Sequence, residues 1–222
     1  MTESRPAAQN PDELFDLVDA TGTPLGQTKR RADVHRDGDW HRAVHVWVFG
    51  TDDAGAFLLL QRRGMEKDTW PGKLDATAAG HLATGETPND AFREIEEELG
   101  VAPDLTILRH VGTRISVSER PPHWLDRELQ EVYLLRDDQP LGIYRPSPAE
   151  VDALVRVSLD AWTELLFGDR DDMSAEALEA GSGATATITT DREDPIPSID
   201  GYFRRIAIAC QRALAGERYV VV

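Results

Sequence analysis

The stretch 80–101 constrains the fold of this chain most strongly, because a glycine-punctuated loop is followed by a helix with two marked ends. Thr87 is a favourable N-cap residue, Pro88 suits the first helical position, and Gly100 supplies a left-handed stop. This pattern predicts a helix over residues 88–99. At about 100° per residue, three residues form the apolar stripe that this helix must bury: Phe92, Ile95 and Leu99.

Three carboxylates lie within one arc beside that stripe: Glu94, Glu97 and Glu98. Side chains three and four positions apart on a helix are neighbours, so these like charges repel one another. A hard divalent cation removes the repulsion, and oxygen atoms are the ligands that Mg²⁺ and Mn²⁺ prefer. The alternative is a solvated acidic face on a surface helix.

Several of these positions together resemble the Nudix box, the signature of the Nudix hydrolase family: Gly80, Glu86, Arg93 to Glu98, Gly100 and Val101. One departure is that six residues, and not the usual seven, separate Glu86 from Arg93. The resemblance implies a Mg²⁺ or Mn²⁺ cofactor held by Glu98 and Glu94, with Glu97 as the next ligand. It also implies that Arg93 holds a glutamate in place.

Four parts are expected along the chain. Residues 1–11 form a disordered tail, 12–168 the main domain, 169–197 a flexible acidic insertion or hairpin, and 198–222 a C-terminal helix that docks on the domain. Strands flanked by a few helices indicate an α/β (α+β) fold. The resemblance implies an α/β/α sandwich with a mixed sheet between helices.

Alternation of apolar residues and turn signals place the individual elements. Strands are expected at Glu13–Val18, Trp40–Phe49, Phe57–Arg63, Ala76–Ala79, Leu105–Val117, Leu129–Leu135 and Glu150–Leu159. Further helices are expected at Lys29–His35, Asp160–Leu166 and Ser198–Ala215, with a turn at Asp19–Gly26 and a loop at Ser118–Trp124.

The net charge limits the classes of molecule that this protein can bind. A formal net charge of −16 repels nucleic acid phosphates, so no polymeric nucleic acid is expected and a small-molecule diphosphate is the expected partner. No apolar run approaches the length of a membrane span, so no membrane partner is expected. Because Cys210 is the sole cysteine, a cytoplasmic location is expected. A homodimer is left open.

Further site residues follow from position. Arg62 and Arg63 end one expected strand and are candidates to hold phosphate, as are Lys67 and Gly80 in the loops that follow. Solvated strand-end charges are the alternative. Glu131 is the candidate general base, because its strand is expected near the metal; a structural ion pair is the alternative.

The surrounding segments resemble one branch of the family, the isopentenyl-diphosphate isomerases. The shared features include histidines at 35, 41 and 81 and the segment Trp70–Asp75. In those enzymes a cysteine precedes the Gly-His pair, and histidines plus strand glutamates bind a metal. Here Ala79 takes the cysteine position. A second metal at His35, His41 and His81 is left open.

Three functions remain. The leading one is divalent-metal-dependent hydrolysis of a diphosphate bond in a nucleoside-diphosphate-linked or related small molecule. The second is an isoprenoid-diphosphate isomerase or hydrolase, and Ala79 counts against the isomerase. The third is a non-catalytic diphosphate-binding module, and the intact glutamates of residues 94–98 count against it.

Overall fold

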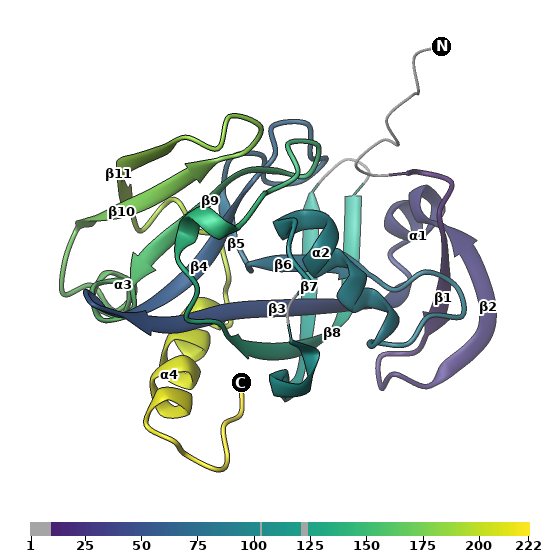
Figure 1. The fold of residues 1–222 in the computed structure, drawn as a ribbon. Coiled ribbons are helices and arrows are strands. Elements are labelled where there is room, and N and C mark those ends of the chain that lie inside the picture. The colour runs from purple at the N-terminus through teal and green to yellow at the C-terminus, as the bar shows by residue number, and fades with distance from the viewer. Residues whose placement is uncertain (1–9, 103, 121–123) are drawn as a thin grey trace.

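A computed structural model describes residues 10–102, 104–120 and 124–222, apart from the side chains of Ala91, Glu94 and Arg120. Within these residues one sheet of nine strands dominates the fold (Figure 1). Seven strands follow one another across it in the order β11-β10-β9-β4-β3-β8-β7, while β5 pairs with β4 and β6 pairs with β3. The bounds are β3 Trp40–Asp52, β4 Gly55–Arg63, β5 Leu74–Asp75, β6 Ala78–His81, β7 Arg109–Arg120, β8 Trp124–Arg136, β9 Val151–Ser158, β10 Asp172–Glu179 and β11 Thr185–Asp191.

The sheet is mixed, because β3 and β8 run parallel and the other pairs in it run antiparallel. Alternation along β8 sends Glu128, Gln130 and Val132 to one face and Glu131 to the other. On β3, Val44 and Val46 face the side of Glu131, where they join the apolar cluster that includes α2 residues. This alternation determines which carboxylates of β8 can reach a site on a given face of the sheet.

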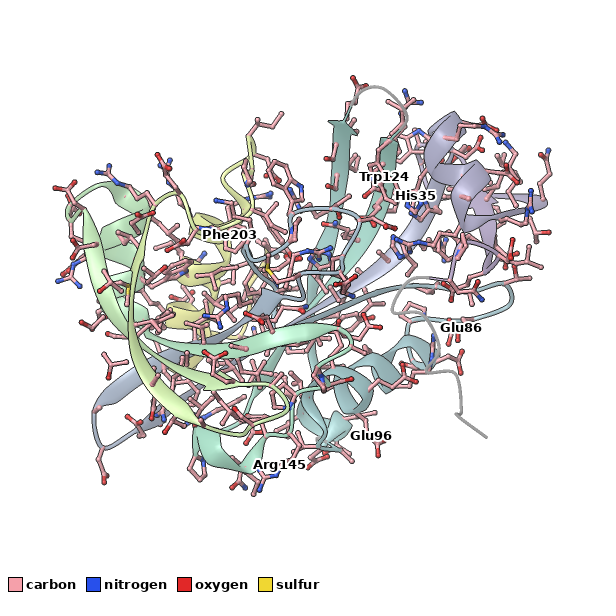
Figure 2. All side chains as sticks on the ribbon, turned by 90° about the horizontal axis from the view of Figure 1, so that it is seen from above. His35, Glu86, Glu96, Trp124, Arg145 and Phe203 are labelled. Atoms are coloured by element: carbon pink, nitrogen blue, oxygen red, sulfur yellow. The ribbon has the colours of Figure 1, made fainter. Side chains whose placement is uncertain are left out.

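Helices cover both faces of the sheet. The helix α2, Arg93–Leu99, packs Ile95 and Leu99 against one face, together with Phe92 from the turn before it, as the apolar stripe predicts. The helices α3, Leu159–Phe167, and α4, Tyr202–Leu214, pack on the other face with Trp162, Phe203 and further core residues. Figure 2 shows Glu96 of α2 and Phe203 of α4 on opposite sides of the strands. The expected α/β/α sandwich is confirmed.

The helix α2 begins later than residue 88. Residues Asp90–Phe92 form a 3₁₀ turn, and the carboxylate of Asp90 accepts hydrogen bonds from the backbone nitrogen and hydroxyl of Thr87 at 2.8 and 2.7 Å. Asp90 therefore reaches back to the cap residue, as in a capping box, but the first turn is tighter than an α-helix. Gly100 ends the helix at a φ of 67°, as predicted.

An N-terminal unit lies beside the sheet (Figure 1). It consists of β1 Leu14–Val18, β2 Pro24–Arg30 and α1 Arg31–Asp37, and its core contains Phe15, Leu17 and Val34. The strand β2 begins inside the expected turn and was not predicted. Its side chains are exposed or half-buried, so no alternation of apolar and polar residues marks it. The expected tail falls largely on residues 1–9, which lie outside the described residues.

The segment after α3 is ordered into the sheet. The strands β10 and β11 pair antiparallel, β10 also pairs with β9, and Met173, Ala175 and Ala177 enter the core. Of the two expectations for residues 169–197, the hairpin is therefore right and the flexible insertion is wrong. The helix α4 then docks through Tyr202, Phe203 and other buried residues, as predicted. Among the described residues, no helix combines the length and the apolar character needed to cross a membrane.

Candidate active site

A cavity of about 1030 Å³ is lined by residues of β3, β4, β6, β7 and β8, of α2, and of the segment that leads into α4. Its volume matches the upper range of small-molecule sites. The lining includes arginines, a lysine, carboxylates and histidines, so the cavity provides both cations for an anionic ligand and ligand atoms for metals.

Of the three α2 carboxylates that the structure describes, Glu97 and Glu98 line the cavity and Glu96 does not. Burial of the apolar stripe turns Glu98 inward, where only 2 % of it is exposed. Its Oε2 accepts a hydrogen bond from the backbone nitrogen of Ala79 at 3.0 Å and from Gln61 at 3.4 Å. Glu97 is exposed at the cavity wall. The side chain of Glu94, the other expected ligand, lies outside the described residues.

Arg93 holds Glu86, as the resemblance implies. Its Nη1 donates to Glu86 Oε1 at 2.6 Å, and the other oxygen of Glu86 accepts from the backbone nitrogen of Ala83 at 2.8 Å. Arg93 also lies 3.7 Å from the carboxylate of Glu97. The shortened spacing between Glu86 and Arg93 therefore still closes the loop onto the helix.

Two of the three expected phosphate-binding cations line the cavity. Arg63 donates to Asp75 at 2.8 Å and to the carbonyl of Thr69, while Lys67 forms an ion pair with Glu150. The backbone position Gly80 also lines the cavity. Arg62 does not: it binds Asp152 at 2.6 Å and Glu179 at 2.9 Å, outside the cavity lining. Its phosphate-binding role is therefore not supported, because the side chain faces the opposite way from Arg63.

Glu131 is also directed away from the cavity. Its carboxylate lies 2.7 Å from His110 Nε2 and accepts from Thr113 at 3.1 Å, and it is absent from the described residues that line the cavity. Its strand does reach the site, as expected, but the side chain lies on the opposite face of β8. The structural ion pair is the alternative that the geometry favours.

Residues from four elements form a second group, which we call the histidine cluster: His35, His41, His81, Asp126 and Glu128. One potential ligand atom from each of His35, His41, His81 and Asp126 lies within 4.8 Å of the others. Nε2 atoms of His35 and His41 are each 3.6 Å from Asp126 Oδ1, and Nε2 of His81 is 2.9 Å from Glu128 Oε1.

The histidine cluster fits a divalent metal. Neither ring nitrogen of His35, nor Nε2 of His41, has a hydrogen-bond partner among the described residues, although both side chains are buried. Buried polar atoms are normally paired, so converging unpaired nitrogens indicate a missing ligand. Three imidazoles with carboxylates are a donor set that suits Zn²⁺, Mn²⁺ or similar ions.

The environment keeps the imidazoles neutral. Burial, followed by the neighbouring histidines and Arg31, lowers the pKa of His35 to about 2. Burial also lowers the pKa of His81, to about 3, despite the hydrogen bond to Glu128. The stacked ring of Trp124, 4.1 Å from that of His35, helps to shield the cluster. A neutral ring carries a lone pair on one nitrogen, and His35 and His41 offer it to a metal, since neither ring nitrogen of His35 nor Nε2 of His41 has a partner among the described residues.

The two carboxylates of the cluster differ. Burial and the charge of Glu128 raise the pKa of Asp126 well above its usual range. Burial alone would raise the pKa of Glu128 too, but the hydrogen bond from His81 and the nearby histidines hold it well below its usual range. The pKa values of the two carboxylates therefore shift in opposite directions.

A family model supports what this geometry indicates: the NUDIX domain matches residues 39–176. The chain belongs to the Nudix family. Nudix enzymes generally need a divalent metal and cleave pyrophosphate bonds, so this is a Nudix-type pyrophosphohydrolase domain. The matched residues include α2, β3, β6 and β8, while β1, α1 and α4 lie outside the match.

Similar proteins carry two kinds of name. The chain is 37 % identical over 152 residues to Nudix hydrolase 3 of Arabidopsis thaliana, covering 68 % of this chain and 19 % of that longer protein. It is 29 % identical over 196 residues to an uncharacterized Nudix hydrolase of Clostridium acetobutylicum, covering 87 % and 94 %. It is 32 % identical over 193 residues to the isopentenyl-diphosphate Delta-isomerase of Paenarthrobacter aurescens, covering 79 % and 100 %.

A solved structure agrees on the fold. DR0079 from Deinococcus radiodurans matches with a TM-score of 0.50 at 22 % identity, over 70 % of this chain and 90 % of that one. At this identity the likeness concerns the Nudix fold alone.

Sequence reasoning missed three contributors to this Nudix site: Arg31, Asp126 and Glu128. Asp126 and Glu128 lie two residues apart on β8, and Gln130 continues their face. This period of two, in a strand extended back to Trp124, was the available signal. Arg31, whose Nη1 lies 2.9 Å from His81 Nδ1, carries no local signal because its partner is fifty positions away.

Proposed function

We propose that this Nudix domain hydrolyses the phosphoanhydride bond of a nucleoside-diphosphate-linked or related small molecule, with Mg²⁺ or Mn²⁺ as cofactor. The observation that carries the proposal is the inward-facing carboxylate of Glu98, almost fully buried in the wall of a cavity that Arg63 and Lys67 also line. Carboxylates alone would repel a diphosphate, and cations alone would bind it without holding a metal.

The lining residues have two roles, holding the metal ion and binding the diphosphate. Glu98 and Glu97, with Glu94 assigned from the sequence, would hold the ion at α2. When bound, such an ion polarises the phosphoryl oxygen and lowers the pKa of water. Arg63 and Lys67 supply positive charge to the diphosphate. Their present partners Asp75 and Glu150 hold both side chains at the cavity before a ligand arrives.

Arg93 orients the acidic end of the helix. It bridges Glu86 and Glu97, so the loop that follows β6 stays beside the α2 carboxylates. A general base must lie within reach of a water in the cavity, which excludes Glu131 in the described arrangement. The role falls to a carboxylate in the lining that does not hold the ion.

One observation favours a second candidate, an isoprenoid-diphosphate isomerase or hydrolase. The histidine cluster adds imidazole ligands that hydrolysis at α2 does not require, and a relative with 32 % identity is named as an isomerase. Ala79 opposes the isomerase, because a methyl group cannot donate or accept the proton that the expected thiol would transfer.

A substrate panel tests these proposals. Nucleotide sugars, dinucleotides, nucleoside di- and triphosphates and prenyl diphosphates would be incubated with Mg²⁺ or Mn²⁺, and the products resolved by chromatography. We expect release of phosphate or a monophosphate that EDTA stops. Dimethylallyl diphosphate formed from isopentenyl diphosphate would establish the isomerase instead. Tight binding without any product would establish the non-catalytic module.

The cellular setting belongs to the same proposal. A small-molecule substrate agrees with the acidic surface, whose net charge is −16. A cytoplasmic location is proposed from the single cysteine, Cys210, which is buried and unpaired.

A further inference from the structure

A chain of hydrogen bonds runs from the histidine cluster to the start of α4. Gln130 Nε2 donates to Glu128 Oε2 at 2.5 Å, and Arg114 Nη1 donates to Gln130 Oε1 at 2.8 Å. Arg114 then binds Asp200 through Nε at 2.8 Å and through Nη2 at 3.1 Å. Three side chains thus connect a candidate metal ligand with a segment outside the NUDIX match.

The arginine determines which end of the Gln130 amide donates and which accepts in this series of hydrogen bonds. A guanidinium has only donors, so the group of Gln130 that faces Arg114 must be its carbonyl oxygen. The NH₂ group of the same amide must then face Glu128, where it meets an acceptor. Without the donor-only guanidinium at position 114, neither of the two orientations of the Gln130 amide is favoured over the other on that side.

The position of Arg114 is itself well determined. Two parallel hydrogen bonds to Asp200 fix the plane of the guanidinium, and the ring of Tyr202 lies 4.0 Å from its central carbon. Only 14 % of the Arg114 side chain is exposed, and Tyr202 is buried in the core. The first residues of α4 therefore place the arginine.

These hydrogen bonds constrain the orientation of the Glu128 carboxylate. Its Oε2 is occupied by Gln130, which leaves Oε1 directed at the histidines, 2.9 Å from His81 Nε2 and 3.8 Å from His41 Nε2. A flipped amide would put a carbonyl oxygen against Oε2 and turn the carboxylate away. Partners behind a metal ligand commonly set its orientation in this manner.

We propose that Arg114 is a positioning residue of the histidine cluster: it fixes the amide of Gln130, which directs one oxygen of Glu128 toward a bound divalent cation. The inference rests on the proposed metal at the histidine cluster and assigns a role in the site to the start of α4.

Co²⁺ binding tests this directly, because imidazole ligands give bound cobalt a visible absorption that can be titrated. His41→Gln first identifies the signal that belongs to the histidine cluster. We expect Arg114→Met to weaken this cobalt affinity about tenfold, within the range for partners behind metal ligands. Arg114→Lys keeps a donor toward Gln130 and is expected to stay within about threefold of the wild type.

Two further variants separate positioning from mere stability. Arg205→Met removes another cation that binds Asp200 but leaves the bonds of Arg114 to Gln130 in place, so cobalt affinity should not change. Gln130→Met should weaken binding as Arg114→Met does, and the double variant should bind no more weakly than Gln130→Met alone, since the two act in series. The comparison of Gln130→Met with the wild type holds even if Arg114→Met folds poorly.

The outcomes are distinct. If His41→Gln removes no part of the cobalt signal of the wild type, the proposal of a metal at the histidine cluster is wrong. This inference is then overturned with it. The proposal of hydrolysis at α2 is unaffected. If the wild type binds cobalt and both Arg114→Met and Gln130→Met bind equally well, the positioning role alone is overturned. An affinity loss in Arg205→Met equal to that in Arg114→Met would also overturn it, because the loss would then come from a general destabilisation of the fold around Asp200.

Discussion

The α2 carboxylates and the histidine cluster, of which His81, Asp126 and Glu128 line the cavity, differ in how the chain builds them. The α2 carboxylates come from a single helical turn, and the burial of Ile95 and Leu99 turns Glu98 inward. The histidine cluster combines side chains from α1, β3, β6 and β8, and it forms only when the sheet and the N-terminal unit have assembled.

The groups also differ in chemistry. The α2 carboxylates offer oxygen atoms beside an open cavity, which suits a hydrated Mg²⁺ or Mn²⁺ that binds with the substrate. The histidine cluster offers buried, neutral imidazoles, which suits a metal that stays in the protein. They lie close together, because Glu98 bonds to Ala79 and His81 follows two residues later, about 7 Å along β6. One cavity can therefore use two metals with separate roles.

The largest effect is expected at Glu98. Changes behind a metal ligand cost about 10- to 100-fold, so Glu98→Gln, which removes a ligand charge, should lower kcat/KM by at least about 100-fold. The control Glu96→Gln lies on the exposed side of the same helix and should change kcat/KM by less than about twofold (Figure 2). Cobalt binding at the histidine cluster should survive in both. Equal activity of the two variants would contradict the role of α2.

The next effect is expected at His41. His41→Gln removes one ligand of the buried cluster and should weaken cobalt binding by roughly 100-fold and hydrolysis by roughly tenfold. His110→Gln, on the opposite face, leaves the cluster intact and serves as the matched control. Titration by visible absorption measures the first quantity. Unchanged cobalt affinity in His41→Gln would show that the two groups do not act as separate metal sites.

A smaller effect concerns acid stability without metal. The folded pKa of His81, about 3, lies below its ordinary value of 6.5, so between these values the unfolded chain binds the extra proton. The free energy of unfolding should therefore fall as pH decreases from about 6.5 to 3. In EDTA, His81→Gln should show a shallower fall in urea titrations over this window than the wild type. Parallel curves would mean that His81 is already protonated in the folded state.

The smallest effect is expected at Glu131. Because its carboxylate pairs with His110 outside the cavity, Glu131→Gln should change kcat by less than about twofold at each pH between 6 and 9. A loss of the acidic limb of the pH profile, where the rate rises as the base loses its proton, would return Glu131 to the role of general base. The measurement is a pH–rate profile of kcat with the best substrate of the panel.

These differences explain what could be predicted from the sequence. The turn of α2 and its stop residue are local, so spacing alone predicted a helix that ends at Gly100. The ligand assignments and the role of Arg93 in holding a glutamate came from the family resemblance, and the structure shows Arg93 bound to Glu86. Strand β3 is rich in β-branched and aromatic residues and β4 in apolar ones, so both could also be predicted. The docking of α4 followed from apolar residues at helical spacing.

Residues whose role depends on strand register were not predictable. Glu131 and Glu128 are three positions apart on β8, and only the location of the cavity on one face decides between them. Arg62 and Arg63 are adjacent and point to opposite sides for the same reason. The strand β2 and the link of Arg114 to Asp200 depend on contacts between distant segments, which leave no periodic signal.

Anomalous diffraction from crystals soaked in Mn²⁺ would test the central claim most directly, namely that this cavity carries metal at its acidic helix. The account predicts an anomalous peak at coordination distance from the carboxylates of Glu97 and Glu98, and a second one among His35, His41 and His81. A cavity in which Glu98 keeps its bond to Ala79 with no peak beside it, in crystals of active protein, would contradict the account.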